Sequence, residues 1–316
     1  MENPLVITSS PHLHCGMTTR GVMLDVLIAL APAAVASVLL FGWQAAAVII
    51  VCAASCVTAE YLTRIVLKRP QTVGDLSAVV TGVLLAFNLP ANIPLWQAAI
   101  GGAAAIVVAK QMFGGLGYNF VNPALIGRIV LMASFPEDMN RWITPLQGSG
   151  TDAISSATPL YILSQGGEMT YSLKQLFFGM RPGSLGEICV LALLLGFAYL
   201  VVRRVISPAI PLVYTGTVFI MTWLLGENPL YHILSGGLML GAIFMATDYT
   251  TSPINKTGKI VFAVGCGLLT VLIRLYGALP EGVSFAIVIM NILVPLIERA
   301  TRPLPFGEKR RLRHEQ

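Results

Sequence analysis

Long, unbroken apolar runs dominate the chain and are separated by short breaks rich in polar residues, Pro and Gly. The runs do not alternate between apolar and polar residues, which favours helices over β-strands. Lipid offers the backbone no hydrogen-bond partners, so spanning segments must be helices or a closed barrel. Ten runs are predicted as helices, with ends good to about 2–4 residues. They cover residues 21–41, 44–66, 76–89, 95–112, 124–135, 185–202, 209–225, 230–246, 259–277 and 282–298.

The runs 76–89 and 124–135 are shorter than the roughly 20 residues that a perpendicular helix needs to cross a bilayer. Each is therefore expected to be either a tilted span or a re-entrant half-helix. Composition agrees with a membrane protein, because only 11% of the 316 residues are charged and 55% are hydrophobic, whereas soluble domains carry about 25% charged residues. The sequence predicts an all-α polytopic membrane protein, with residues 1–316 forming a single integral membrane domain.

One long connection divides the chain into two helix groups. The expected parts are a first helix group at 21–135, a loop at 137–184, a second helix group at 185–298 and a basic tail at 299–316. A loop of this length inside a compact protein is usually functional. It is the first place to look for a site.

Basic residues flank only alternate ends of the ten predicted spans. They are Lys68, Arg69, Arg203, Arg204, Lys256, Lys259 and the Lys and Arg residues of the tail. The positive-inside bias makes that face cytoplasmic, so both termini are predicted to be cytoplasmic and the long loop extracytoplasmic. These flanks account for the net charge of +5, and no nucleic-acid partner is expected. The expected environment is the lipid bilayer.

The chain contains a weak internal repeat. Thr81-Gly82 matches Thr215-Gly216, and Gly101-Gly102 matches Gly236-Gly237 in the same order. Repeats are frequent in transporters, with sites at the repeat interface. A ten-span count shifts the copies by four helices and makes them parallel, whereas an inverted repeat requires one short run to be re-entrant. Both forms stay open at this level.

The long loop carries the sequence Ser156-Ala157-Thr158-Pro159-Leu160. This stretch resembles the flavin-attachment motif of the RnfD/NqrB family, which comprises the D-type component of Rnf ferredoxin:NAD oxidoreductases and the B-type component of the sodium-pumping NADH:quinone reductase. Further stretches resemble the same family along nearly the whole chain. They are Ser10-Pro11-His12, Gly115 to Asn119, Gly183 to Glu187, Ala246-Thr247-Asp248 and Pro280 to Val283. The longer N-terminal extension of the quinone-reductase component is missing, which favours the Rnf component.

The resemblance implies that the hydroxyl of Thr158 forms a phosphoester with FMN. Pro159 disfavours a helical conformation at Thr158. The phosphate needs hydrogen-bond donors, for which backbone amides and hydroxyls at Ser155 and Ser156 are candidates, with Ala157 between them and the attachment residue. The competing interpretation is an ordinary polar loop.

Several charged residues within or beside the apolar runs are candidates for function, because charge at membrane depth is costly. Arg274 either faces the flavin phosphate or pairs with Glu281. Glu187 opens the sixth run and is assigned to the cofactor site. Asp25 and Asp248 are candidates for the ion path. No residue is assigned a catalytic role.

Other residues are interpreted as structural. Glu60 and Arg64 are spaced i, i+4, which favours an ion pair on one helix face. The five cysteines are scattered and the histidines lack partners at ligand spacing. No metal site and no iron–sulfur cluster is therefore expected.

The resemblance implies a membrane subunit of a redox-driven ion pump. Such a subunit carries covalent FMN and relays electrons between ferredoxin and NAD, coupled to movement of Na⁺ or H⁺, as part of an ion-translocating oxidoreductase in a bacterial or archaeal cell membrane. Its expected partners are the other Rnf subunits, A, B, C, E and G. The family is also associated with a second, non-covalent riboflavin, whose site the sequence does not indicate.

Two alternatives stay open. The first is the B-type component of the sodium-pumping NADH:quinone reductase, with a quinone as electron acceptor. The second is a flavin-free channel or solute transporter of the urea-transporter type, which the family resembles in fold. The repeat suits this second alternative as well as it suits the pump, and the Ser156–Leu160 motif speaks against it.

Overall fold

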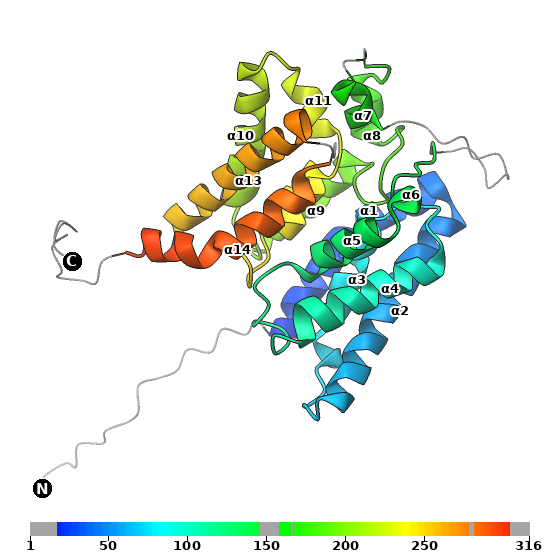
Figure 1. Cartoon of the computed structure of the whole chain (residues 1–316), viewed down its shortest axis with the longest axis vertical. Coiled ribbons are helices and arrows are strands. Elements are labelled where there is room, and N and C mark those ends of the chain that lie inside the picture. The colour runs from blue at the N-terminus through cyan, green and yellow to red at the C-terminus, as the bar shows by residue number, and fades with distance from the viewer. Residues whose placement is uncertain (1–17, 146–157, 166, 168, 278–280, 304–316) are drawn as a thin grey trace, which may run out of the picture.

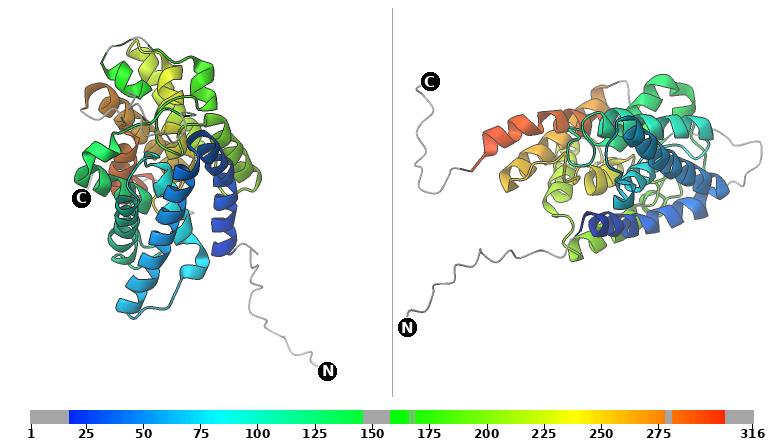
Figure 2. Two further views of the ribbon diagram at one scale, coloured as in Figure 1. Left: turned by 90° about the vertical axis from the view of Figure 1, so that its right-hand side faces the viewer. Right: turned by 90° about the horizontal axis from the view of Figure 1, so that it is seen from below.

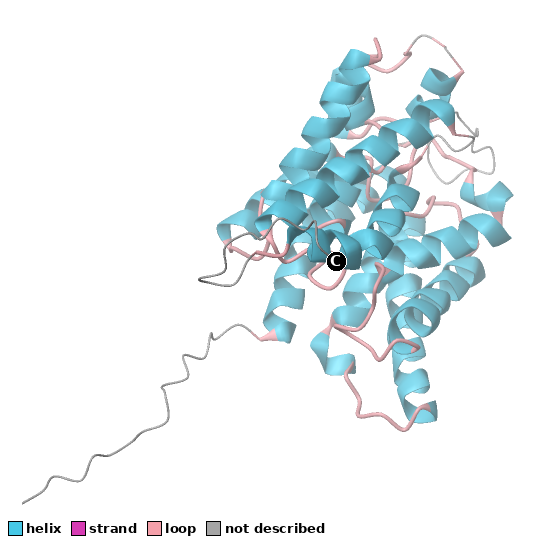
Figure 3. Cartoon of the chain, turned by 60° about the vertical axis from the view of Figure 1, so that its left-hand side comes forward, coloured by secondary structure: helices cyan, strands magenta, loops and turns pink. Residues whose placement is uncertain are grey.

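The computed structural model describes residues 18–145, 158–165, 167, 169–277 and 281–303. Within these ranges the regular structure is entirely helical, as Figure 3 shows. The first group comprises α1 (Thr19–Phe41), α2 (Trp43–Val66), η1 (Val73–Asp75), α3 (Ser77–Phe87), α4 (Leu95–Ile106), η2 (Val107–Gln111) and α5 (Pro123–Ser134). The second comprises α9 (Val190–Val202), α10 (Ala209–Leu224), α11 (Pro229–Leu234), α12 (Leu238–Leu240), η3 (Gly241–Met245), α13 (Lys256–Tyr276) and α14 (Val283–Thr301). All-helical architecture is confirmed.

Local chemistry explains where the first helices begin and end. The Thr18 hydroxyl accepts the Gly21 amide at 3.1 Å and caps α1. Gly42 adopts φ +72° and separates α1 from α2 by a single residue. The predicted runs 21–41, 44–66, 76–89 and 124–135 lie within two residues of the observed helices.

The sixth predicted run begins too early. Helix α9 starts at Val190, and Ser184 to Cys189 precede it without regular helix. The amides of Leu185 and Gly186 donate instead to the carbonyls of Leu89 and Phe87, at 3.0 and 2.9 Å. A Cβ on Gly186 would lie 2.2 Å from the Cβ of Phe87, so only glycine permits this approach. The segment therefore bonds to the end of α3.

The eighth predicted run is broken in its middle. Helix α11 ends at Leu234, and Gly236 adopts φ +67° before α12 and the π-helical η3 continue the path. The fourth run is continuous, but its last turn, η2, is also π-helical. The Gly236-Gly237 pair stands at the break, whereas the Gly101-Gly102 pair of the fourth run lies inside the continuous helix α4.

The two groups lie side by side and pack in matching pairs (Figures 1 and 2). Helix α2 packs on α4 as α10 packs on α13, and α4 packs on α5 as α13 packs on α14. The first helices of the groups, α1 and α9, pack on each other. We count the elements in chain order and take α3 as one element and the broken segment α11–η3 as one element. Each helix of the first group then matches the helix five elements later.

Helix α9 is inverted relative to α1. Near one end of the α1–α9 contact the Tyr199 hydroxyl donates to Asp25, and in the middle a Cβ on Gly196 would meet the Ala29 carbonyl. At the other end the Ser37 hydroxyl donates to the Leu185 carbonyl, just before α9. Along this contact the residue numbers increase in α1 and decrease in α9 and the segment before it. The two helices therefore run antiparallel. This inverted pairing of α1 with α9 differs from the sequence matches, which align Thr81-Gly82 of α3 with Thr215-Gly216 of α10.

The helices expose apolar side chains as a membrane protein does. Among the described residues, four helices are long and apolar enough to cross a bilayer, namely α1, α2, α13 and α14. Shorter apolar helices are α3, α5, α9 and α10. Leu39, Trp43, Val66 and Val202 are more than 70% exposed on the helices, and such surfaces suit lipid or protein partners rather than water. The chain is a polytopic membrane protein with several candidate spans.

The described part of the connection between the groups contains three short helices. They are α6 (Pro136–Met139), α7 (Pro159–Ser164) and α8 (Leu173–Phe178). Helix α7 contacts α13, and α8 contacts α9 and α11, so this part of the connection lies over the second group (Figure 1).

Tight contact between α2 and α3 requires glycine at position 82. A Cβ there would lie 2.6 Å from the Ala53 Cα, whereas a Cβ on Gly216 in α10 would meet nothing within 4 Å. We expect Gly82→Ala to destabilise the protein by about 1–3 kcal/mol through overpacking. Gly216→Ala is the matched control and should be neutral or slightly stabilising, because alanine favours the helix. Thermal unfolding in detergent measures both, and equal midpoints would contradict the packing argument.

Candidate functional site

Thr158 is held at the start of α7. Its side-chain oxygen accepts the Tyr161 amide at 3.3 Å, and its backbone is extended, with φ −68° and ψ 152°. The expectation that Pro159 keeps Thr158 out of a helical conformation is confirmed. Both residues are buried. Ser155, Ser156 and Ala157 lie outside the described residues.

A pocket, here called the α7 pocket, lies beside this helix. Leu160, Leu163 and Ser164 form its α7 wall, and Arg274 and Leu275 of α13 lie opposite with Glu227 and His232. The pocket holds about 620 Å³ of space, counted with its open mouth. Thr158 thus starts a helix whose later residues line a space that a buried guanidinium also borders.

Arg274 is directed at the end of α11. Its Nη1 donates to the His232 carbonyl at 2.6 Å and its Nη2 to the Ser235 carbonyl at 3.2 Å. These carbonyls belong to the last turn of α11, where backbone groups lack helical partners. Its Nε has no hydrogen-bond partner among the described residues. The alternative expectation, an Arg274–Glu281 pair, is not what these contacts show.

Glu281 instead pairs with Arg128 of α5. The Nη1 of Arg128 also donates to the Asn88 side chain and to the Ser284 hydroxyl, both at 3.0 Å. Arg128 therefore joins the end of α3 to the start of α14, one element from each group. Its neighbours Arg181 and Glu187 are also almost fully buried. Arg128, Arg181, Glu187, Arg274 and Glu281 are called the arginine–glutamate cluster below.

The Gly236-Gly237 turn lies between the α7 pocket and the rest of the cluster. A Cβ on Gly236 would lie 2.4 Å from Leu160 and 3.1 Å from the Arg274 Nη2. A Cβ on Gly237 would lie 3.4 Å from the Glu187 Oε2. The two faces of one backbone turn thus contact the Thr158 helix on one side and Glu187 on the other.

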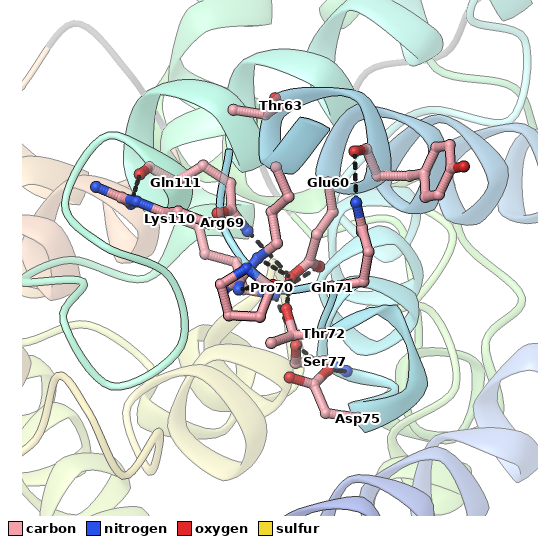
Figure 4. A network of polar contacts seen from close by, with 12 residues as sticks. Glu60, Thr63, Arg69, Pro70, Gln71, Thr72, Asp75, Ser77, Lys110 and Gln111 are labelled. Atoms are coloured by element: carbon pink, nitrogen blue, oxygen red, sulfur yellow. Dashed lines mark hydrogen bonds and ion pairs between the residues drawn. The ribbon is translucent and has the colours of Figure 1, made fainter. Parts of the chain in front are cut away.

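A second buried network ties together α2, η2 and α3 (Figure 4). The Lys110 Nζ donates to the Glu60 Oε2 at 2.8 Å and to the Ser77 hydroxyl at 2.6 Å. Thr72 and Gln111 donate to the other carboxylate oxygen at 2.8 and 3.0 Å. The predicted Glu60–Arg64 ion pair is present at 3.8 Å, but Lys110 is the shorter contact.

Lys110 also borders another hollow between the groups, here called the interhelical cavity. Its apolar walls come from α1 and α3, and its polar lining includes Asn119, Asn122 and Asp248. It holds about 760 Å³, counted with its open mouth. Apolar walls with a few convergent polar groups are typical of a cofactor or ligand site.

Comparison with known proteins adds the family. The model of a family described as the NQR2, RnfD, RnfE family matches residues 6–307. The chain belongs to this family.

Relatives within the NQR2, RnfD, RnfE family align along nearly their whole length. The chain is 47% identical to the D subunit of the Na⁺-translocating ferredoxin:NAD⁺ oxidoreductase complex of Acetobacterium woodii, covering 97% of this chain and 96% of that protein. It is 44% identical to the D subunit of the proton-translocating ferredoxin:NAD⁺ oxidoreductase complex of Clostridium ljungdahlii, covering 98% of each. It is also 34% identical to the D subunit of an ion-translocating oxidoreductase complex of Escherichia coli, covering 96% and 99%.

The two acidic candidates for an ion path lie in different surroundings. Asp25 on α1 accepts the Tyr199 hydroxyl at 2.8 Å and pairs with Arg203 at 3.3 Å. Asp248 follows η3 and accepts the hydroxyls of Thr250 and Thr251 at 3.1 and 3.3 Å. Only Asp248 is among the residues that line the interhelical cavity.

Sequence reasoning missed Lys110, Arg128 and Arg181 as buried charges. The signal was present for the first two, because each is a cation inside or at the end of a predicted apolar run. Arg181 stands in the connection, where nothing in the pattern predicts burial. Among the described residues no group of three or more His, Cys, Asp or Glu side chains could hold a metal ion.

Replacing Lys110 tests the network in Figure 4. Lys110→Met leaves the Glu60 carboxylate, 0% exposed, without its nearest cation. Stability should fall by about 3–5 kcal/mol, as for other broken buried pairs. Arg203→Gln serves as the control, because the Arg203 side chain is 57% exposed and such pairs contribute little. Unfolding midpoints in detergent decide, and similar losses for both variants would refute the assignment.

Proposed function

We propose that this chain is the D subunit of a Rnf-type ion-translocating ferredoxin:NAD⁺ oxidoreductase and carries FMN on Thr158. The observation that carries the proposal is the position of Thr158, in the motif Ser156–Leu160, at the start of a helix whose Leu160 lines a pocket with a buried arginine. The printed names of the relatives support the complex. The same names favour the Rnf component over the quinone-reductase component.

The residues around the pocket fit an FMN phosphate. Thr158 would supply the ester oxygen, and the amides and hydroxyls of Ser155 and Ser156, next to Ala157 in the sequence before Thr158 and Pro159, are the proposed donors to the phosphate. The Arg274 guanidinium has an unpartnered Nε, and His232 makes no side-chain hydrogen bond among the described residues. A buried cation with a spare donor suits an anionic group. Glu187 was assigned to this site, but lies across the Gly236-Gly237 turn from Arg274, so its role is indirect.

The bound flavin would supply one- and two-electron chemistry. The chain itself tethers the cofactor through Thr158, balances its phosphate charge through Arg274 and shields it with the leucines of α7. Ferredoxin oxidation and NAD reduction would take place on partner subunits, for which A, B, C, E and G are proposed.

The remaining parts of the proposal concern the membrane. Ten spans in an inverted, urea-transporter-like arrangement would place both termini in the cytoplasm and the Thr158 loop outside, in a bacterial or archaeal cell membrane. Asp248 at the cavity wall and Asp25 beside Arg203 are proposed for the ion path. One relative is named for Na⁺ and another for protons, at 47% and 44% identity. Their similarity therefore favours neither cation.

Thr158→Ala should abolish covalent flavin. The protein is made together with a flavin transferase, separated under denaturing conditions and examined for in-gel fluorescence and intact mass. Thr158→Ser keeps a hydroxyl and should retain part of the signal. Ser164→Ala removes another hydroxyl of the same helix and should retain all of it. Fluorescence that persists in Thr158→Ala would rule out this attachment residue.

The interhelical cavity is our proposed site for a second, non-covalent riboflavin. The Lys110 Nζ makes two hydrogen bonds and can donate a third. Asn119 and Asn122 add amide groups to otherwise apolar walls. This combination suits a flat ring with polar edges.

Val80→Phe tests this cavity, because Val80 lines it from α3. Riboflavin released by denaturation should fall severalfold, while covalent fluorescence stays unchanged. Val83→Phe places the same side chain on the same helix away from the cavity and should leave riboflavin at the wild-type ratio. Equal release from wild type and Val80→Phe would place the second flavin elsewhere.

A further inference from the structure

Glu187 is a buried carboxylate that no cation in the described part of the chain contacts directly. Its residue is 2% exposed. One oxygen, Oε1, accepts the Ser184 amide at 3.1 Å. The other, Oε2, has no hydrogen-bond partner among the described residues. Burial of an unpaired carboxylate is strongly unfavourable, so this arrangement calls for a positively charged ligand or a proton.

The neighbouring guanidiniums make their contacts elsewhere. Arg128 pairs with Glu281 and bonds to Asn88 and Ser284. Arg181 donates from Nη2 to the main-chain carbonyl of Glu187 at 2.8 Å, not to the carboxylate. Arg274 donates its hydrogen bonds to carbonyls at the end of α11. These arginines lie close enough to interact electrostatically with the carboxylates of Glu187 and Glu281. None of them donates a hydrogen bond to the Glu187 Oε2.

Space beside the Glu187 Oε2 is kept free by Gly237. A Cβ at that position would lie 3.4 Å from this oxygen, in ordinary contact. The backbone of Gly237, with φ −75° and ψ 15°, would accept any L-residue. Backbone geometry thus gives no reason for glycine here. Two further buried oxygens without partners among the described residues, the hydroxyls of Ser184 and Ser235, belong to the same two segments.

We propose that the Glu187 carboxylate, beside Gly237, is a binding site for a monovalent cation, either a proton or Na⁺. Both cations share one chemistry, which is neutralisation of the unpaired oxygen. The site itself follows from the contacts of Glu187. Its coupling to electron transfer rests on the proposed function.

The coupling of cation binding to electron transfer follows from charge balance. The arginine–glutamate cluster holds three guanidiniums and two carboxylates, a net charge of +1 with all groups ionised. A phosphodiester on Thr158 would add one negative charge and make the region neutral. An electron that then arrives at the flavin adds another negative charge, and one cation at Glu187 restores neutrality. The Gly236-Gly237 turn brings the two sides together.

Labelling with dicyclohexylcarbodiimide tests the site in the assembled complex. This reagent attacks protonated carboxyls in apolar surroundings. The carboxyl proton moves to a carbodiimide nitrogen while the carboxylate oxygen bonds to the central carbon, adding the whole reagent mass. Peptide mass spectrometry should find the adduct on Glu187, with labelling that falls about tenfold per pH unit once the carboxyl ionises. Glu60, equally buried but paired with Lys110, is the internal control and should stay unlabelled.

Sodium and Gly237→Ala separate the two cations. If Na⁺ binds, added Na⁺ protects Glu187 from the reagent in wild type, and the methyl group of Gly237→Ala removes that protection. If only a proton binds, Na⁺ has no effect in either protein and labelling is unchanged by Gly237→Ala. Absence of label on Glu187 at every pH and Na⁺ concentration, or label equal to that on Glu60, overturns the proposal.

The flavin hypothesis can fail separately. Thr158→Ala should still be labelled at Glu187, because the carboxyl and its surroundings are intact. In the flavin-bearing protein, chemical reduction should increase labelling severalfold at fixed pH if the proton is the cation, or increase Na⁺ protection if it is Na⁺. Redox-independent labelling would leave a cation site but refute its coupling to electrons.

Discussion

Every polar group inside this apolar bundle must find its partner within the protein, and that constraint organises the structure. Glu60 is surrounded by Lys110, Thr72 and Gln111, and Arg128 bonds residues from both helix groups. Such contacts cost more to break than an exposed pair, because the group left behind stays buried. Buried pairs therefore fix how the helices meet, and the single carboxylate without one, Glu187, stands out among the described acids of the arginine–glutamate cluster.

Backbone groups obey the same constraint where helices stop. The segment before α9 offers its amides to the end of α3, and Arg274 fills the role of a cap at the end of α11. Glycine makes both contacts feasible, at Gly186 against Phe87 and at Gly236 against Leu160. Interrupted helices are tolerated at membrane depth only when protein groups satisfy the freed backbone in this way. The breaks are consequently where the candidate site is built.

Much of the fold could be predicted from the sequence, because long apolar runs have one helical solution in lipid. The ends of α1, α2 and α3 were found within two residues. The start of α9 and the break at Gly236 were not, because apolar letters do not reveal that Leu185 and Gly186 bond to another helix. For the site, resemblance to a family pointed to Thr158, but the contacts of Arg274 and the burial of Arg181 depend on tertiary proximity. The antiparallel arrangement of α1 and α9 likewise follows only from their contacts.

The bond between the pre-α9 segment and the end of α3 limits how this protein can move. Two main-chain hydrogen bonds and the Gly186–Phe87 contact join a piece of the second group rigidly to the first. The two helix groups cannot move past each other as rigid bodies without breaking the contacts between this segment and α3. A pump built on such a scaffold would work through small side-chain and loop displacements around a fixed centre, in contrast to carriers that expose their site alternately by swinging one half against the other.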